Sequence, residues 1–351
     1  MSGAEGAVEA APSYTRLTAQ RLACLISGAG ILLLAAVADV LIGPAFLDLG
    51  AVLEALLAPS GAERSTVVIV WDIRLPMTLM AILVGAALAI AGVAMQTILG
   101  NPLASPYTLG FSAAAGFGAA LIILTGAMLP FVPWLTVPLA AFLASGAAAA
   151  LVYGFASIRG MSAEVMVLAG IATLFLFQSL QSLVQYLAAP EVLQAIVFWL
   201  FGSLLKASWT TLPITAAITA LCVALLIPDL WRLTALRLGD HRAAALGVDV
   251  RRLRIKTFAL VALLTAGAVS FVGTIGFVGL VAPHLARGLV GDDQRFLMPM
   301  AALCGALVMV GASILSKLIS PGSVIPIGIV TAVIGVPFLF GLILRGRRRY
   351  W

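Results

Sequence analysis

The chain has 351 residues, of which 62% are hydrophobic and 10% are charged, whereas a typical soluble domain carries about 25% charged residues. This composition excludes a water-soluble fold, because a domain of this length could not hide so much apolar surface. The net charge of +6 does not indicate nucleic-acid binding, because the basic residues lie in short loops and are not interleaved with aromatic residues. Most of the chain is therefore predicted to lie in membrane lipid.

The N-terminal segment is polar and ends at an apolar run. Residues 1–21 are predicted to form a cytoplasmic tail, and residues 22–43 form the first apolar run. Residues 36–38, Ala-Val-Ala, resemble a signal-peptide cleavage site, but the run is long for a signal peptide. We therefore favour a retained first transmembrane helix.

Nine further apolar segments follow, with Pro and Gly at the joints between them. One of them is too short to cross a bilayer alone, since a transmembrane helix needs about 20 apolar residues. The sequence predicts an all-α polytopic membrane protein with about ten transmembrane helices, in a single domain of residues 22–344. The nine segments are 75–99, 107–128, 132–156, 163–187, 210–228, 256–275, 278–290 (the short one), 296–317 and 324–344.

The basic residues predict the orientation of the chain. With a cytoplasmic N-terminus, four of the 20 Lys and Arg residues fall outside and the rest fall inside, as the bias of cytoplasmic loops requires. Both termini are therefore predicted to be cytoplasmic in a multi-pass protein of the inner (plasma) membrane, with residues 345–351 as a basic tail. The outer four are Arg64, Arg74, Lys206 and Lys317.

The largest cytoplasmic loop, residues 229–256, contains a short helical signal. Asp240 is placed as an N-cap, the alanines that follow favour helix, and Gly247 is placed to end it. Two interpretations remain open. The segment is either a helix that docks in a groove of a soluble partner or an ordinary connector whose arginines hold the membrane boundary.

Three glutamines mark one face of the segment 163–187. Gln178, Gln181 and Gln185 are three and four residues apart, which is the spacing of neighbours on a helix. An unsatisfied amide in lipid costs several kcal/mol, so the stripe is expected to face protein or water. It is either a wall of a translocation path or a set of interhelical hydrogen bonds.

No motif for catalysis or cofactor binding is present. The P-loop pattern GxxxxGK[ST] does not occur, so ATP and Mg²⁺ would have to be bound by a separate subunit. Cys24, Cys222 and Cys304 stand singly, without a CxxC pair or a histidine at metal-ligand spacing. No catalytic residue, metal site or resident cofactor is predicted, and the chain is not expected to be an enzyme.

An ion-coupled secondary transporter is the alternative from another functional class. Such a carrier is expected to hold a carboxylate or histidine deep in a helix. Asp39, Asp72, Arg74 and Lys317 lie toward the outer ends of their segments, so this alternative is weakened but not excluded.

Motifs in both halves of the chain resemble the FecCD-type permeases, the membrane subunits of importers for iron-siderophores, haem and cobalamin. The resemblance runs from about residue 70 to the C-terminus. In the first half it rests on Arg74-Leu75-Pro76, residues 83–89 (Leu-Val-Gly-Ala-Ala-Leu-Ala), Gly92, Gln96, residues 101–106 (Asn-Pro-Leu-Ala-Ser-Pro) and Leu109-Gly110. In the second half it rests on residues 276–287 (GFVGLVAPHLAR) and 326–338 (PIGIVTAVIGVPF).

The resemblance implies a type II ABC importer permease of ten helices. Its partners would be a second permease, identical or different, two ABC ATPase subunits, and a periplasmic or extracellular binding protein. Transport would proceed by alternating access. It makes the helix in the largest loop the coupling helix that contacts the ATPase, with the candidate residues Asp240, His241, Arg242, Ala244, Leu246 and Gly247.

The resemblance also assigns roles to three other groups of residues. It favours the translocation path for Gln178, Gln181 and Gln185. It predicts a cytoplasmic gate at Asn101, Pro102, Leu103, Met161, Ser162 and Ala163. It predicts that Arg74 and Lys317 dock the binding protein.

Two departures from the family pattern affect docking and substrate. Met77 stands where the family often has a second arginine, and Lys317 stands where it has an arginine, so fewer bidentate contacts with acidic residues are expected. Both histidines lie near cytoplasmic segments, which favours an iron-siderophore over haem or cobalamin as the substrate.

Overall fold

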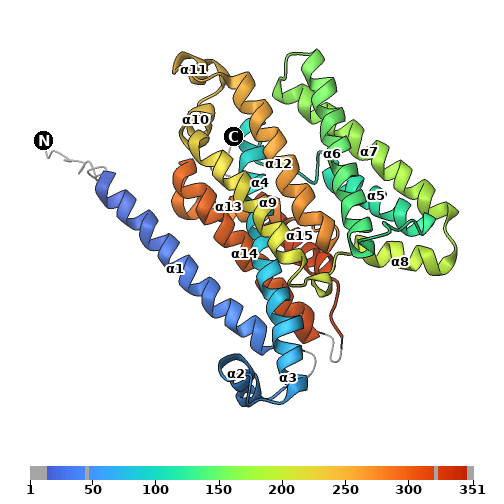
Figure 1. Cartoon of the computed structure of the whole chain (residues 1–351). Helices are drawn as coiled ribbons and strands as arrows, with labels where there is room; N and C mark the ends of the chain where they lie inside the picture. The colour runs from blue at the N-terminus through green and yellow to red at the C-terminus, as the bar shows by residue number, and fades with distance from the viewer. Residues whose placement is uncertain (1–13, 44–46, 320–322, 346–351) are drawn as a thin grey trace, which may run out of the picture.

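The computed structural model describes residues 14–43, 47–319 and 323–345, and within these ranges all regular structure is helical (Figure 1). Each of the ten predicted apolar segments forms a helix, which confirms the predicted fold class. They are α1 (Tyr14–Leu41), α4 (Leu75–Ile98), α5 (Phe111–Thr125), α6 (Thr136–Ile158), α7 (Ala163–Leu187), α9 (Thr211–Leu226), α12 (Val250–Val272), α13 (Val278–Val290), α14 (Gln294–Ile319) and α15 (Ile327–Arg345).

Seven helical segments in the described ranges are long and apolar enough to cross a membrane. They contain α1, α4, α6, α7, α9, α12 and α14. The apolar helices α5 and α13 are shorter, as is the apolar part of α15 from residue 327 to 341. Residues 14–21 of the predicted N-terminal tail are helical, while residues 1–13 and 346–351 lie outside the described residues.

Five further helices connect these elements: α2 (Leu49–Leu57), α3 (Arg64–Val68), α8 (Pro190–Leu200), α10 (Leu230–Leu236) and α11 (Asp240–Ala245). The apolar helix α8 is absent from the sequence prediction, because its 11 residues are fewer than a membrane span requires. Its first residue, Pro190, is a proline at a helix start, where its missing N–H removes no intrahelical hydrogen bond.

The helix predicted to start at residue 75 does so, but further helical turns precede it. A continuous helical segment runs from Arg64 to Ile98, through a π-helical turn at Ile69–Arg74 and into α4. Pro76 lies directly after this wide turn, at a position where the sequence suggests a helix start. The start predicted at residue 75 is therefore confirmed for α4, while the π-helical turn and α3 extend the helical segment upstream to Arg64.

Helix α4 is the centre of the bundle. Most of its residues are buried, and it packs against α12, α13 and α14. At two points glycines bring helix backbones together. A Cβ added to Gly85 would lie 2.3 Å from the carbonyl oxygen of Gly305 in α14. A Cβ added to Gly92 would clash with the backbone of Gly279 in α13.

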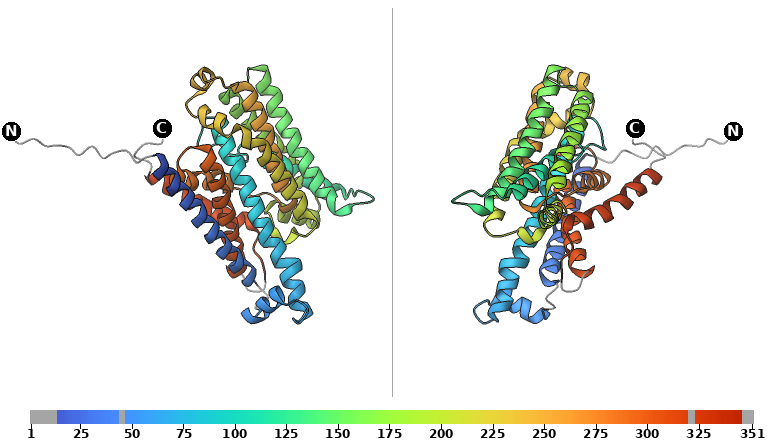
Figure 2. Two further views of the ribbon diagram at one scale, coloured as in Figure 1. Left: turned by 60° about the vertical axis from the view of Figure 1, so that its left-hand side comes forward. Right: turned by 90° about the vertical axis from the view of Figure 1, so that its right-hand side faces the viewer.

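Two groups of helices lie on either side of α4 and α12. Helices α5 to α8 lie together on one side, and α1, α13 and α14 lie on the other (Figure 1). Helix α12 packs against both α4 and α6. Helix α1 runs along α14, and α15 leaves the bundle beyond α13 and α14 (Figure 2).

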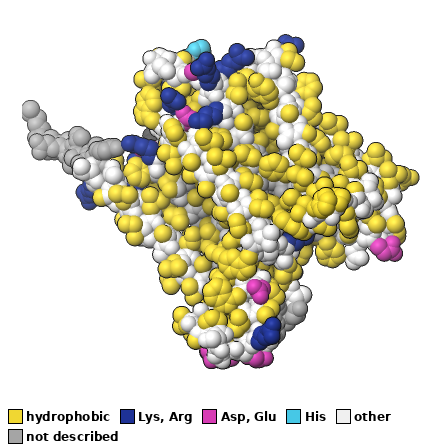
Figure 3. Space-filling model, viewed as in Figure 1, with side chains coloured by type: hydrophobic (Ala, Val, Ile, Leu, Met, Phe, Trp, Pro, Cys, Tyr) yellow, Lys and Arg dark blue, Asp and Glu magenta, His cyan; other side chains and the backbone are white. Residues whose placement is uncertain are grey.

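Charged side chains are distributed unequally along the bundle. Lys and Arg gather around α10 and α11, whereas acidic side chains are visible at the opposite end, near α2 and α3 (Figure 3). A broad apolar surface lies between the two ends. This arrangement is typical of a protein whose middle faces lipid.

Candidate coupling and gating site

Helix α11 lies where the sequence predicts the coupling helix. It begins after Gly239 (φ +97°), and Gly247 (φ +84°) follows its end. Both glycines adopt positive φ, which other residues rarely do. The helix is thus bounded on both sides by backbone that only glycine adopts without strain.

The predicted coupling residues all lie on the exposed side of this segment. Asp240, His241, Arg242, Ala244, Leu246 and Gly247 are exposed. Ala243 and Val248 are buried beneath them and attach the segment to the bundle. With Leu246 52% exposed, the surface that α11 presents is small and apolar at its end and charged at its start.

The predicted N-cap role of Asp240 is wrong. Gly239 precedes the helix, and no side chain caps its first turn. The Asp240 carboxylate instead accepts hydrogen bonds from Arg254 Nη2 at 2.9 Å and 3.0 Å. The long-range ion pair takes the carboxylate away from the local backbone.

Arg254 of α12 connects α11 with both predicted gate segments. It is 5% exposed; its Nε donates to the carbonyl of Ile98 at 2.9 Å and its Nη1 to the carbonyl of Met161 at 3.1 Å. Ile98 ends α4, three residues before Asn101. The sequence analysis missed this residue, because its backbone partners are 156 and 93 positions away.

The first predicted gate segment is a tight turn after α4. The backbone N–H of Asn101 donates to the carbonyl of Gln96, and the Asn101 side chain accepts from the N–H of Leu103 at 2.9 Å. Pro102 and Leu103 are exposed, Leu103 by 54%. The turn therefore presents the apolar side chain of Leu103 outward, while the two hydrogen bonds hold its backbone in place.

The second predicted gate segment joins α6 to α7. Met161 is buried and has φ +61°, which is uncommon for a residue other than glycine. Ser162 caps α7, with its hydroxyl accepting from the N–H of Val165, and Ala163 is the first residue of that helix. The hydrogen bond from Arg254 to Met161 holds this unusual turn.

Two more polar side chains hold the end of α4. Arg287 Nη2 donates to Gln96 Oε1 at 3.0 Å and Arg287 Nε pairs with Asp292 at 2.9 Å. Gln294 Nε2 donates to the hydroxyl of Thr97 at 2.8 Å. Both donate to side chains in the last turn of α4, and the Arg287 cation is stabilising there because the last carbonyls of a helix carry partial negative charge.

The glutamine stripe faces different surroundings along α7. Gln178 is exposed, whereas Gln181 and Gln185 are partly buried. Gln181 packs against α5, because a Cβ on Gly116 would lie 2.6 Å from Gln181 Oε1. The structure therefore supports packing for Gln181 and leaves Gln178 free to line a path.

The two predicted docking cations are buried. Lys317 Nζ donates to Asp39 Oδ1 at 2.8 Å and to the Asp39 carbonyl at 2.7 Å, and Arg74 donates to the carbonyls of Val40 and Leu41. Arg74 is 3% exposed and Lys317 4%. Arg74 joins the end of α1 to the π-helical turn before α4, and Lys317 joins it to α14. The docking prediction therefore rests on side chains that this conformation does not present outward.

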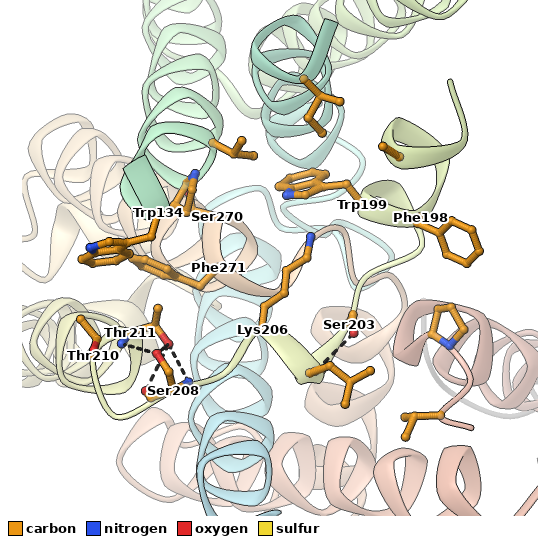
Figure 4. Close-up of a pocket in the computed structure, with 17 residues that line it drawn as sticks. Trp134, Phe198, Trp199, Ser203, Lys206, Ser208, Thr210, Thr211, Ser270 and Phe271 are labelled. Atoms are coloured by element: carbon orange, nitrogen blue, oxygen red, sulfur yellow. Dashed lines mark hydrogen bonds between the residues drawn. The ribbon is translucent and has the colours of Figure 1, made fainter. Parts of the chain in front are cut away.

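A cavity of about 780 Å³ lies between the starts of α6 and α9, helix α8 and the end of α12. Figure 4 shows Lys206 extending toward the ring of Trp199, and its Nζ lies 5.5 Å from the ring centroid. Desolvation lowers the pKa of Lys206 to about 8, which leaves it mostly charged at pH 7. The aromatic walls and one cation suit an organic anion with an apolar body.

Comparison with known proteins places the whole bundle in one family. The FecCD transport family matches residues 31–345. The hemin transport system permease protein HmuU of Yersinia pestis is 36% identical over 80% of this chain and 83% of its own length. The Fe(3+) dicitrate transport system permease protein FecD of Escherichia coli is 35% identical over 84% of this chain and 91% of its own length.

A solved structure agrees with the sequence matches. An inward-facing conformation of a metal-chelate type ABC transporter superposes with a TM-score of 0.80 at 33% identity, covering 92% of this chain and 98% of that one. The resemblance seen in the sequence motifs is thus confirmed along nearly the full length of the bundle. The chain belongs to the FecCD transport family.

Proposed function

We propose that the chain is the membrane-spanning permease of an ATP-binding-cassette importer that moves an iron-siderophore inward across the plasma membrane. The observation that carries the proposal is the exposed helix α11, joined through Arg254 to the end of α4 and the α6–α7 turn. A chain without a P-loop needs a partner to hydrolyse ATP. Helix α11 offers that partner a surface connected to the interior.

The partners follow from the same arrangement. ATPase subunits would bind at the end that carries α10 and α11. The excess of basic residues there supports a cytoplasmic location for this end. Both termini of the chain would then be cytoplasmic, as the sequence predicts. A second permease, identical or different, would cover exposed faces of α6 and α7. An external binding protein would approach the opposite end, near α2 and α3.

The substrate proposal rests on the chemistry of the walls. Relatives of this chain are named for hemin and for Fe(3+) dicitrate, so family membership leaves several metal chelates. His241 lies on the exposed face of α11 and His284 packs against Phe338, with ring centroids 6.0 Å apart. Neither histidine lines the cavity beside Lys206 and Trp199, which favours an anionic siderophore over haem.

The decisive experiment uses the chain with its ATPase in proteoliposomes. ATP hydrolysis and association are measured with and without Leu246→Asp, which places a charge on the apolar end of α11. Leu57→Asp is the matched control, because Leu57 is 84% exposed at the opposite end. We expect Leu246→Asp to abolish association and stimulated hydrolysis, and Leu57→Asp to leave both unchanged.

The same preparation tests the ion-coupled alternative. A lone chain that accumulates substrate under an ion gradient, with no ATPase bound, would show that the importer assignment is wrong. Uptake that requires ATP and is blocked by vanadate would exclude the carrier. Competition between ferric siderophores and hemin for ATP-driven uptake then separates the two substrate classes.

A further inference from the structure

The side chain of Arg254 links three separate segments with one rigid group. Its Nε, Nη1 and Nη2 donate to Ile98, Met161 and Asp240, at distances between 2.9 Å and 3.1 Å. A guanidinium is planar, and its donors have fixed directions. When one of the three partners moves, Arg254 has to follow it or lose a hydrogen bond.

The three partners differ in how easily they can leave. The carbonyls of Ile98 and Met161 are backbone groups at the end of α4 and in the α6–α7 turn, and Arg254 is 5% exposed beside them. The side chain of Asp240 is 54% exposed on α11. If α11 shifted alone, Asp240 would remain hydrated, but Arg254 would keep a buried charge without its carboxylate, which is costly.

From this asymmetry we infer that Arg254 transmits a displacement of α11 to both segments of the cytoplasmic gate, the turn after α4 and the α6–α7 turn. The inference rests on the proposed function, in which the ATPase moves α11. It makes Arg254 a positioning residue that touches neither nucleotide nor substrate. Its loss would separate ATP hydrolysis from movement of the gate.

The same helix supplies a matched control. Arg252 lies two residues before Arg254, its side chain is 90% exposed, and it pairs with Asp249 at 3.3 Å in the same helical turn. Arg252→Gln therefore removes the same charge from the same helix without breaking a link between α11 and the gate. A general effect of lost positive charge would appear in both variants.

The measurement is the accessibility of the gate, which needs no substrate. Leu103, 54% exposed, is changed to cysteine, and its reaction with a membrane-impermeant maleimide is timed in the ATPase complex with and without ATP and vanadate. The chain without Leu103→Cys corrects for the native cysteines. We expect Arg254→Gln to keep ATP hydrolysis but to reduce the nucleotide-dependent change in labelling rate by about tenfold, and Arg252→Gln to keep that change.

Two further variants guard against a folding defect. Arg254→Lys keeps the charge without the fork and should not restore the labelling change. Asp240→Asn removes the ionic partner while leaving the buried guanidinium in place, and in complexes that still contain the ATPase it should reduce the change as well. The double variant Asp240→Asn, Arg254→Gln should be no worse than Arg254→Gln alone, because both act on one interaction.

Contrary results are equally clear. If Arg254→Gln and Asp240→Asn both respond to nucleotide as the parent does, or Arg252→Gln loses the response as fully, Arg254 does not transmit the movement. If the parent with Leu103→Cys binds no ATPase, the proposed function itself fails before any variant of Arg254 is measured.

Discussion

The two ends of α4 are both held by charged side chains from distant helices, but the two sets of interactions differ in their access to water. At the end near α2, Asp39 and Lys317 have side chains that are 0% and 1% exposed, and Arg74 is buried beside them. At the other end, Arg254 and Arg287 pair with Asp240 and Asp292, whose side chains are 54% and 52% exposed.

This difference separates a fixed end from an adjustable one. A buried ion pair cannot exchange its partners for water without a large penalty. A carboxylate that already faces water loses little hydration when its helix shifts, provided that the buried arginine follows it. The end near α2, which we call the closed end, should therefore matter most for stability. The end near α11, which we call the open end, should matter most for conformational change.

The largest expected effect is at the closed end. Lys317→Met leaves the Asp39 carboxylate buried without its ammonium partner and should lower the free energy of unfolding by about 3 to 5 kcal/mol. Chemical unfolding in detergent micelles measures it. Arg64→Met, an exposed cation near the same end, should cost little.

A double variant tests whether charge pairing is the cause. Asp39→Asn combined with Lys317→Met removes both charges and should recover much of the loss. If Lys317→Met and Arg64→Met lowered the free energy of unfolding equally, the buried ion pair would contribute no more than an exposed cation. The proposed difference between the two ends of α4 would then be wrong.

A substitution in the middle of α4 comes next. Gly85→Ala forces a methyl group against the backbone of Gly305 and should destabilise the chain by about 1 to 3 kcal/mol. Gly311→Ala in α14 is the control, because nothing lies within 4 Å of its added Cβ. The same unfolding assay compares them, and a harmless Gly85→Ala would show that α4 and α14 can separate at small cost.

At the open end, Arg287→Met should cost less than Lys317→Met. It removes a hydrogen bond to Gln96, but Asp292 is half-exposed and can be hydrated, so a loss of about 1 to 2 kcal/mol is expected. Unfolding of the two variants side by side measures the difference. A loss as large as that of Lys317→Met would contradict the proposed contrast.

The smallest effect concerns the start of α12, which carries Arg254. Asp249 caps this helix, its carboxylate accepting from the N–H of Arg252 at 3.0 Å. Asp249→Ala should cost about 1 kcal/mol, and Asp249→Asn, which keeps a capping oxygen, should cost less. Thermal unfolding ranks the two variants, and the reverse order would exclude capping as the cause.

The sequence was informative wherever the signal was local. All ten predicted apolar segments form helices, and the short helix between Asp240 and Gly247 lies where its alanines and glycine placed it. Helix α8 was missed because its 11 residues, which include a Glu and a Gln, are too few for a membrane span. The helical residues 64–74 that precede α4 were missed, because Pro76 is typical of a helix start.

The interactions between segments could not be predicted in the same way. Arg254 looks like one more cytoplasmic arginine until its partners, far apart in the chain, are brought together. For Lys317 and Asp39, 278 positions apart, a signal did exist. A charged side chain in an apolar helix requires a partner, and two such side chains of opposite charge are the simplest partners for one another.

The contacts between glycines in the core have a mechanical consequence. Helices whose backbones touch at Gly85 and Gly305, and again at Gly92 and Gly279, cannot slide without first separating, so α4, α13 and α14 should move as one rigid body. Helices α5 to α8 would then form the second body. From α12, Arg254 donates to the carbonyl of Ile98 at the end of α4, in the first body, and to the carbonyl of Met161 in the α6–α7 turn, in the second. It therefore lies at the pivot between the two bodies.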